Sequence, residues 1–503
     1  MRTLYAARRV YTLGYPAIGE WILVDDRHVQ RVGIGAPPPS DRVVRIEGTT
    51  ILPGFVDCHV HLTSTGFALA NGEVEGVRSA DELLALARRR VAEGREVTLL
   101  SGFDETRWKE PRLPTLEELD AITSGPLAIR RIDGHVAIAN SAAIRLADLE
   151  GERGAERDSH GSLTGRLTQE ANARLARWGA QTFTDQEVQE FQLEAAARAS
   201  SRGITTVHEM SMPHELGLRD LEVYLGHRDK LPVDSIVMVA TTDIPQAMDL
   251  RLPSIGGDLP IDGSLGARTA WLSARYEDGE GTGASYYGDE ELARFFLGGH
   301  TAGLQVGVHA IGDRAVEQAL SCWEEVYATL DSRGRRHFRA RRHRLEHFEM
   351  AAASQVERAV MLGLAASVQP AFDERWGHVD GLYERRVGAH RAHSMNPFRT
   401  MLERGLELGA GSDSPVTTLD PMSGIEALET HHDPSQRLTR TEAVRLWTIG
   451  GARLAHLEDK KGVLEPGMHA DFAAWPADPI EEPSVGGLRP VITVSLGREV
   501  HAS

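Results

Sequence analysis

The chain has 503 residues, of which 41% are hydrophobic and 25% charged, and a formal net charge of −18. This composition is typical of a globular protein that is too long for one small core. The acidic balance argues against a general affinity for nucleic acid or for anionic membranes, so neither is expected as a partner. One basic run, residues 333–344, departs from this balance and is interpreted as a solvated loop.

Cysteine usage and the distribution of apolar residues bear on the cellular compartment. The chain has two cysteines, Cys58 and Cys322, so no disulfide framework is expected and a reducing compartment is the default. The N-terminus lacks the pattern of a signal peptide, and no stretch of 18 apolar residues occurs. We therefore expect a cytoplasmic protein.

Both ends of the chain have the pattern of short strands separated by turn residues. Residues 1–52 contain three such segments, and residues 459–503 contain further ones, including 490–500. Because these β-rich ends flank a mixed middle, we predict a small β-sandwich assembled from both termini.

The middle, residues 53–458, alternates helical and strand patterns and is predicted to be an α/β unit. Its eight expected strands, in chain order, are 51–62, 203–210, 231–240, 255–263, 303–313, 342–350, 363–372 and 406–416. Eight strands alternating with helices favour a distorted (β/α)8 TIM barrel, with its active site at the C-terminal ends of the strands. An open doubly wound sheet is the alternative. The long connection at about 64–183 is predicted to be an insertion subdomain over the barrel mouth.

Residues able to bind a metal end four of the expected strands. His59 and His61 point to the same face because strand side chains alternate. His309, His347 and Asp413 end the fifth, sixth and eighth strands. Imidazole and carboxylate ligands suit Zn²⁺ or a similar divalent ion, and a catalytic site keeps one position open for water. Each residue alone could equally be a hydrogen-bonded core residue, but their convergence predicts a metal site.

The motifs PGFVDCHVH, VHAIGDRAV, RLEHFEM, SVQPAF, GSDSPV and GVLEPGMHADF together resemble the metal-dependent amidohydrolase superfamily, specifically its YtcJ-like branch, which includes N-substituted formamide deformylases. The resemblance runs almost end to end. It implies hydrolysis at a zinc centre in a barrel flanked by a β-sandwich. It places the five residues above on the family's metal positions. In mononuclear members the first three histidines and the aspartate hold the ion, which would leave His347 to contact the reacting carbonyl or the water.

The chain departs from the family pattern after its fourth expected strand. Binuclear relatives use a carboxylated lysine there to bridge two ions, whereas this chain has Asp258 in GDLPIDGS. We therefore favour one ion, with Asp258 as a candidate ligand of a second. A polar residue beside a Gly-rich turn is the equally weighted alternative.

The predicted mechanism follows from these ligands. A divalent ion lowers the pKa of a coordinated water toward about 7 and polarises a carbonyl. Asp413 is placed to accept the water's proton and pass it to the leaving nitrogen, and His347 to stabilise the oxyanion. Five residues are candidates for substrate binding: His135, Asn140, Arg314, Gln369 and Trp376. The competing interpretations are a helix-start network for the first two, an ion pair for Arg314, and no functional role for the last two.

The predicted activity is zinc-dependent hydrolysis of a non-peptide C–N bond in a small-molecule N-acyl or N-formyl amide. The alternatives are a deaminase of an amidine-containing heterocycle, a zinc lactonase or carbamate hydrolase, and, more remotely, a non-catalytic metal-binding regulatory protein. Another divalent metal could replace zinc. A homodimer is a possible assembly.

Overall fold

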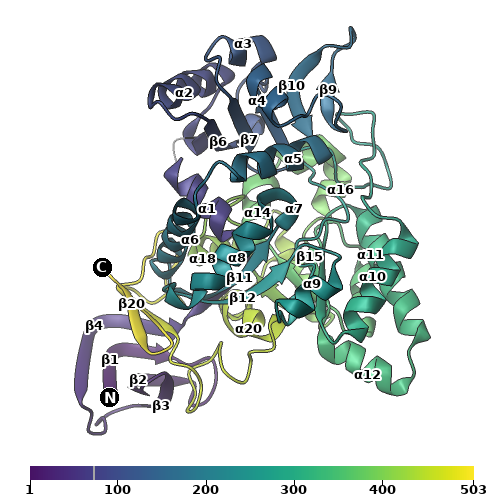
Figure 1. The fold of residues 1–503 in the computed structure, drawn as a ribbon. Coiled ribbons are helices and arrows are strands. Elements are labelled where there is room, and N and C mark those ends of the chain that lie inside the picture. Colours follow the sequence, from purple (N-terminus) through teal and green to yellow (C-terminus); the bar gives the residue numbers. More distant parts are fainter. Residues whose placement is uncertain (72–73) are drawn as a thin grey trace.

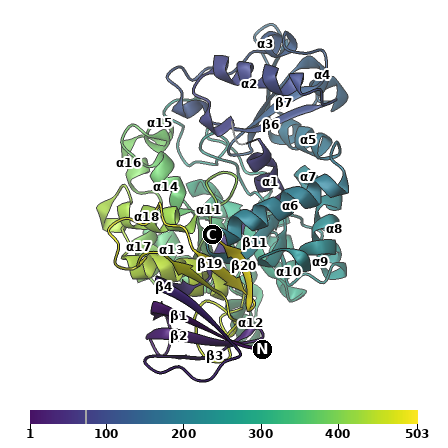
Figure 2. The ribbon, with the colours of Figure 1, turned by 90° about the vertical axis from the view of Figure 1, so that its left-hand side faces the viewer.

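The computed structural model describes residues 1–71 and 74–503 of the chain. Strands from both termini form one mixed seven-stranded sheet in the order β20-β19-β18-β4-β1-β2-β3. These strands span Arg2–Tyr11 (β1), Ile18–Asp25 (β2), His28–Gly33 (β3), Arg42–Pro53 (β4), Phe472–Trp475 (β18), Ile492–Ser495 (β19) and Arg498–Ala502 (β20). The predicted sandwich is therefore hydrogen-bonded as one continuous sheet, at the opposite end of the molecule from the insertion (Figures 1 and 2).

Packed rings and a buried ion pair join this sheet to the central body. Trp475 on β18 lies against Phe55 on β5 (Phe55–Val60), with ring centroids 5.7 Å apart. The buried Lys461 amine contacts Asp471 at 2.6 Å and Asp234 at 3.0 Å. A buried charge costs free energy unless it is paired, so the two carboxylates fix the lysine and the segments that carry them.

The central body is built from parallel strands in two arcs. One arc has the order β12-β11-β5 and the other β13-β14-β15-β16-β17. Besides β5, they comprise Ile204–Ser211 (β11), Asp234–Val239 (β12), Ser254–Ile255 (β13), Gln305–Ala310 (β14), Arg344–His347 (β15), Ala365–Val368 (β16) and Glu407–Ala410 (β17). The arcs meet at both edges. The Gly256 N–H donates to Val239 O, and the Asp413 N–H donates to His59 O. The C-terminal ends of these strands thus face one region.

Helices surround these strands in chain order (Figure 1). Around the arcs they span Leu62–Ala70 (α1), Asp185–Ser200 (α6), Pro213–Leu216 (α7), Leu218–His227 (α8), Ile244–Asp249 (α9), Asp289–Thr301 (α10), Asp313–Thr329 (α11), Ser332–Arg341 (α12), Ala353–Leu362 (α13), Pro370–Trp376 (α14), Leu382–Val387 (α15), Ala389–His393 (α16), Phe398–Glu403 (α17), Pro421–Thr430 (α18), Arg440–Arg445 (α19) and Gly451–Leu454 (α20). The basic run predicted as a loop is mostly α12. Asp331 caps this helix by accepting from Gly334 N, and buried Phe338 anchors it.

The fourth strand is much shorter than predicted. The sequence pattern indicated residues 255–263, but β13 covers only Ser254–Ile255. Gly256 and Gly257 then adopt φ of 84° and 61°, and a Cβ on Gly256 would lie 2.1 Å from Gly307 O. Glycine alone tolerates this backbone and this close approach. The chain leaves the strand here, and Asp258 lies in the irregular segment that follows.

The long connection after α1 forms its own layer of strands and helices, at one end of both ribbon views (Figures 1 and 2). Its sheet has the order β6-β7-β8-β10-β9. The elements span Ala80–Ala92 (α2), Thr98–Phe103 (β6), Leu116–Asp120 (α3), Leu127–Arg131 (β7), Val136–Ala139 (β8), Ser141–Leu146 (α4), Ala155–Arg157 (β9), Leu163–Thr168 (β10) and Gln169–Ala180 (α5). Leu100, Phe103 and Ile129 are among the buried residues of its separate core.

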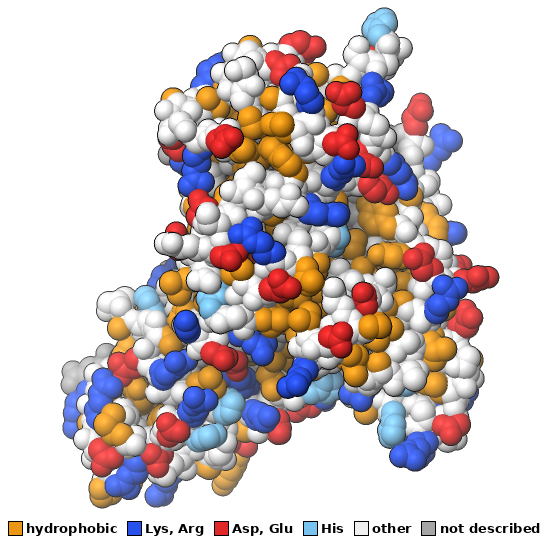
Figure 3. Space-filling view, viewed as in Figure 1, with side chains coloured by type: hydrophobic (Ala, Val, Ile, Leu, Met, Phe, Trp, Pro, Cys, Tyr) orange, Lys and Arg blue, Asp and Glu red, His pale blue; other side chains and the backbone are white. Residues whose placement is uncertain are grey.

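None of the helices in the described ranges is both long and apolar enough to cross a membrane. On the face drawn in Figure 3, acidic and basic side chains are interspersed.

Candidate metal centre

Two histidines and two aspartates converge at the C-terminal ends of β5, β13 and β17. Nε2 of His61 lies 3.1 Å from Oδ1 of Asp413 and 3.5 Å from Oδ2 of Asp258. Nε2 of His59 lies 3.4 Å from Oδ1 of Asp413 and 3.6 Å from Oδ1 of Asp258. Ligand atoms about 2.0–2.2 Å from a tetrahedral zinc ion are roughly 3.3 Å apart, so this spacing fits one divalent cation.

A hydrogen-bond acceptor contacts Nδ1 of each of the two imidazoles. Nδ1 of His59 lies 3.0 Å from the Glu346 carboxylate, and Nδ1 of His61 lies 2.8 Å from the backbone oxygen of Met210. Both partners are acceptors, so Nδ1 of each ring carries a proton and Nε2 of each ring faces the aspartates. This is the orientation that a metal ligand needs.

Two buried atoms at the centre of this group lack hydrogen bonds within the described part of the chain. They are Nε2 of His59 and Oδ1 of Asp413. Burial opposes a charged imidazole, but Asp413 and Asp258 raise the pKa of His61 to about 10. A buried group of lone pairs and carboxylates requires a positive charge, either a proton or a cation. The residues present therefore fit a divalent metal ion.

His347 and Asp258 form a second contact beside the first. Nε2 of His347 lies 3.4 Å from Oδ1 of Asp258, the oxygen that also faces His59. The imidazole of His309 packs edge to face on His347, with ring centroids 4.5 Å apart. Asp258 thus lies between the His59–His61 pair and the His309–His347 pair, which is where a bridging carboxylate would lie.

His309 is placed differently from the other predicted ligands. Its Nδ1 lies 3.4 Å from Oδ1 of Asp262, and Asp262 also accepts from the N–H groups of Ile311 and Gly312. At this centre the ligand atoms that come close together form the sets His59–His61–Asp413 and His59–Asp258–His347, neither of which includes His309. Asp258, rather than His309, completes the group around His59 and His61.

The backbone is strained at two of these residues. His347 and Asp413 have φ of 69° and 52°, in the left-handed region that residues with a side chain seldom occupy. His347 is the last residue of β15 and Asp413 follows β17, and the turn at each residue directs its side chain to the shared centre. Such conformations cost of order 1–3 kcal/mol and cluster at functional sites.

Glu346 links the metal ligands to a buried network that the sequence analysis missed. Its carboxylate accepts from Nε of Arg344 at 2.8 Å and from the Arg344 NH2 group at 2.9 Å. Arg344 also donates to Nδ1 of His208 and to the backbone oxygen of Cys58. Burial opposes ionisation of Glu346, but Arg344 and His59 lower its pKa to about 2. The alternating positions Arg344 and Glu346 on one strand were the available signal.

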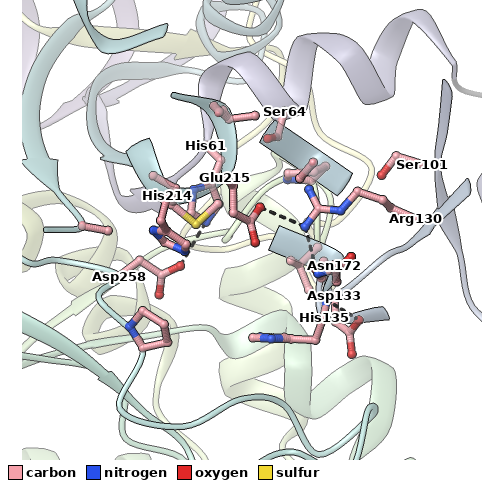
Figure 4. A pocket seen from close by; sticks show the side chains of 18 of the residues that line it. His61, Ser64, Ser101, Arg130, Asp133, His135, Asn172, His214, Glu215 and Asp258 are labelled. Carbon is pink, nitrogen blue, oxygen red and sulfur yellow. Dashed lines mark hydrogen bonds and ion pairs between the residues drawn. The ribbon is translucent and has the colours of Figure 1, made fainter. Parts of the chain in front are cut away.

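A cavity of about 810 Å³ opens over this centre. Its base includes His61, Asp258, His309, His347 and Asp413. Its upper wall comes from the inserted layer and includes Leu99, Leu100, Arg130 and Asp133. Figure 4 shows Arg130 and Glu215 pointing toward each other, with 2.8 Å between their charged atoms. No sequence pattern indicated this pair, because it joins the insertion to α7.

Two of the five predicted substrate-binding residues line the cavity. His135 lies beside His309, with ring centroids 6.0 Å apart, and Trp376 lines the wall near Phe372. Burial lowers the pKa of His135, so its imidazole is neutral at pH 7.

The other three predictions are not supported by the placement of the side chains, since none of these residues lines the cavity. Asn140 caps α4: its Oδ1 accepts from the N–H groups of Ala143 and Leu127, and its Nδ2 donates to two backbone oxygens. All its hydrogen-bonding capacity is used in the fold. Arg314 is exposed and stacks 4.8 Å over Trp271. Gln369 is buried at the start of α14.

Comparisons with known proteins agree with this geometry. The amidohydrolase family model matches residues 42–501. YtcJ of Bacillus subtilis (strain 168) is 27% identical over 88% of this chain and 86% of its own length. The N-substituted formamide deformylase of Arthrobacter pascens is 26% identical over 89% and 87%, respectively. A structure of an uncharacterized metal-dependent hydrolase from Pyrococcus horikoshii OT3 matches with a TM-score of 0.77 and 26% identity, covering 97% of this chain and all of that one.

Proposed function

The chain belongs to the amidohydrolase family, and on that premise we propose that it hydrolyses a non-peptide C–N bond, most simply the amide of a small N-acyl or N-formyl compound, with zinc as its ion. The observation that carries the proposal is the convergence of His59, His61, Asp258 and Asp413 beneath a large cavity. The similarity to an N-substituted formamide deformylase supports the choice of an amide.

We infer that the two strand arcs form one distorted (β/α)8 barrel, residues 53–458, that carries the insertion and is flanked by the terminal sheet. The hydrogen bonds from Gly256 to Val239 and from Asp413 to His59 support closure. A cytoplasmic location, expected from the two unpaired cysteines, belongs to the same proposal.

His59, His61, Asp413 and Asp258 would hold the principal ion, and Asp258 with His347 offers a second position. A bound divalent cation supplies an activated water and polarises the scissile carbonyl. The protein provides the fixed geometry. Glu346 holds His59, the Met210 carbonyl holds His61, and strained turns hold His347 and Asp413. Ligands held in advance lose little further freedom during the reaction.

Asp413 and His347 carry the proton transfer and the charge stabilisation in this proposal. Oδ1 of Asp413 is buried at the base of the cavity without a hydrogen bond among the described residues, so it is free to accept the proton of the attacking water. The same carboxylate then delivers that proton to the leaving nitrogen. His347, at the cavity base beside Asp258, donates a hydrogen bond to the carbonyl oxygen as it gains negative charge.

The cavity walls favour a substrate with a bulky apolar group on the amine. Phe67, Phe183 and Phe191 line one side and contact one another, with ring centroids 5.2–5.7 Å apart. Tyr286, Tyr287 and Trp376 add further aromatic surface. Burial of such a group supplies binding free energy at about 25 cal/mol per Å².

A substrate panel tests the reaction type. Zinc-loaded protein would be incubated with N-formyl and N-acetyl derivatives of methylamine and benzylamine, with an amidine heterocycle and with a lactone. The proposal predicts equal amounts of carboxylate and amine from the benzylamine derivatives. Ammonia from the heterocycle without amide turnover would identify a deaminase, and turnover of the lactone alone would identify a lactonase. Binding of zinc without turnover of any compound would favour a non-catalytic protein.

A further inference from the structure

A second group of metal-capable side chains lies on the side of α14 away from the cavity. Asp373 lies on this helix, and His431 and His432 directly follow α18. Oδ1 of Asp373 lies 3.3 Å from Nε2 of His431 and 2.5 Å from Nδ1 of His432. The three ligand atoms form one compact set, and Asp373 and His431 are buried.

Backbone groups contact the second nitrogen of each ring. Nδ1 of His431 lies 3.0 Å from Asp433 N and 3.2 Å from Asp433 O, so it can either accept or donate. Nε2 of His432 lies 3.2 Å from the His393 carbonyl, which can only accept, so Nε2 carries a proton. Nδ1 of His432 shares a proton with Oδ1 of Asp373, and once that proton is lost the Nδ1 lone pair can bind a cation. Oδ2 of Asp373 accepts from the backbone N–H of His432 at 3.0 Å, and Oδ1 is the oxygen that faces both imidazoles.

His431 provides an independent sign of a ligand. Its side chain is fully buried, and its Nε2 makes no hydrogen bond within the described part of the chain, although it is directed at Asp373. A divalent cation between Nε2 and the carboxylate oxygen would satisfy both buried atoms.

Gly377 keeps this space open. Its φ of −83° is accessible to any residue, so the backbone does not require glycine. A Cβ at this position would lie 2.7 Å from Oδ1 of Asp373 and 3.0 Å from Nδ1 of His432. A side chain at this position would fill the space beside the two ligand atoms, and glycine leaves that space free.

We propose that Oδ1 of Asp373, Nε2 of His431 and Nδ1 of His432 bind a divalent transition-metal ion at a site separate from the catalytic centre. Imidazole with carboxylate suits zinc and its neighbours, and the 3.3 Å spacing matches ligands on one ion. The Asp373–His432 pair opens slightly as the ion replaces the proton. Water takes the remaining position at the partly exposed edge of His432.

The ion would tie the segment after α18 to α14. Phe372 and Trp376 on α14 line the catalytic cavity, and the Phe372 ring stacks over His347 with centroids 5.9 Å apart at 13°. The proposed site thus acts as a structural clamp behind one wall of the cavity.

Metal analysis with matched variants tests the site. Wild type, His432→Gln, Asp373→Asn and the control His300→Gln would be stripped with chelator, loaded with zinc and dialysed together. His300 is a half-buried histidine on α10 whose Nδ1 lies 3.2 Å from Nε2 of His343. We expect one ion fewer per chain in His432→Gln and Asp373→Asn than in wild type, and no change in His300→Gln.

Thermal melting gives a second measurement on the same four proteins. Zinc should raise the melting temperature of wild type and His300→Gln more than that of the two site variants. Equal ion counts and equal zinc-induced shifts in all folded proteins would overturn the proposal and leave Asp373 and the histidines as an ion pair. Because the comparison is a difference between variants, its outcome does not depend on how many ions the catalytic centre holds.

Discussion

Nδ1 of His59 donates to the Glu346 carboxylate across 3.0 Å, and Arg344 holds that carboxylate through two further hydrogen bonds. We expect Glu346→Gln to weaken zinc affinity at the catalytic centre by about 10–100-fold, because the amide loses the charge that fixes the imidazole. A competitive chelator titration measures this affinity. Glu407→Gln, which alters a more exposed pair with Arg453, is the control, and equal affinities would show that Glu346 does not position His59.

Asp413→Asn tests the proton transfer. An amide keeps the size of the carboxylate and one ligand oxygen, but it cannot accept a proton at neutral pH. We expect kcat to fall by about 10²–10⁴-fold at saturating zinc and substrate. The control is Asp185→Asn, which changes an exposed carboxylate at the start of α6. Retention of full kcat by Asp413→Asn would exclude this residue as the base.

Phe183→Ala tests the substrate wall. Phe183 lies in the loop between α5 and α6 and contacts Phe67 and Phe191 in the cavity. Removal of the ring should raise KM for a benzylamine amide by roughly tenfold, since loss of apolar contact costs about 1–3 kcal/mol. KM for the corresponding methylamine amide should change little. Equal changes for both compounds would mean that the aromatic side does not bind the amine substituent.

Asp220→Asn tests a pH effect on stability. Burial raises the pKa of Asp220 to about 6, although Thr63 and Gln192 hydrogen bonds oppose this shift, and the nearby Glu209 is the other acidic group. A raised pKa means that the stabilising contribution is present below the unfolded value near 3.9 and is lost as pH rises through about 6.

Asn cannot ionise, and its NH2 group could donate to Oε1 of Gln192, which lacks a hydrogen-bond partner among the described residues. We expect the variant to be more stable than wild type by about 2 kcal/mol at pH 8 and nearly equal at pH 4.5. Thermal melting at both pH values measures the difference. Identical shifts at the two pH values would contradict the assignment.

Much of the catalytic centre could be predicted because its residues stand at the ends of strands that are recognisable in the sequence. His59 and His61 follow a strand pattern, and His309, His347 and Asp413 end others, so a barrel-like arrangement of parallel strands brings them together. The family assignment, confirmed by the match over residues 42–501, rests on the same motifs.

The remaining features depend on contacts that the local pattern does not record. Asp258 faces His59 because two glycines end β13 early, whereas the sequence indicated a longer strand. Asn140 was a candidate for substrate binding, but it caps a helix within the insertion. The Arg130–Glu215 pair depends on where the insertion lies relative to the strands. The pattern of hydrophobic residues along the chain does not determine that position.

Reconstitution with metal tests whether amide hydrolysis by this protein depends on a bound ion. Chelator-stripped protein would receive increasing equivalents of zinc while amine release from the best amide substrate is measured, with Asp413→Asn in parallel. We expect negligible turnover without metal, recovery with added zinc in wild type, and a kcat lower by at least about 10²-fold in the variant at every zinc level. Full turnover by metal-free protein would contradict this expectation.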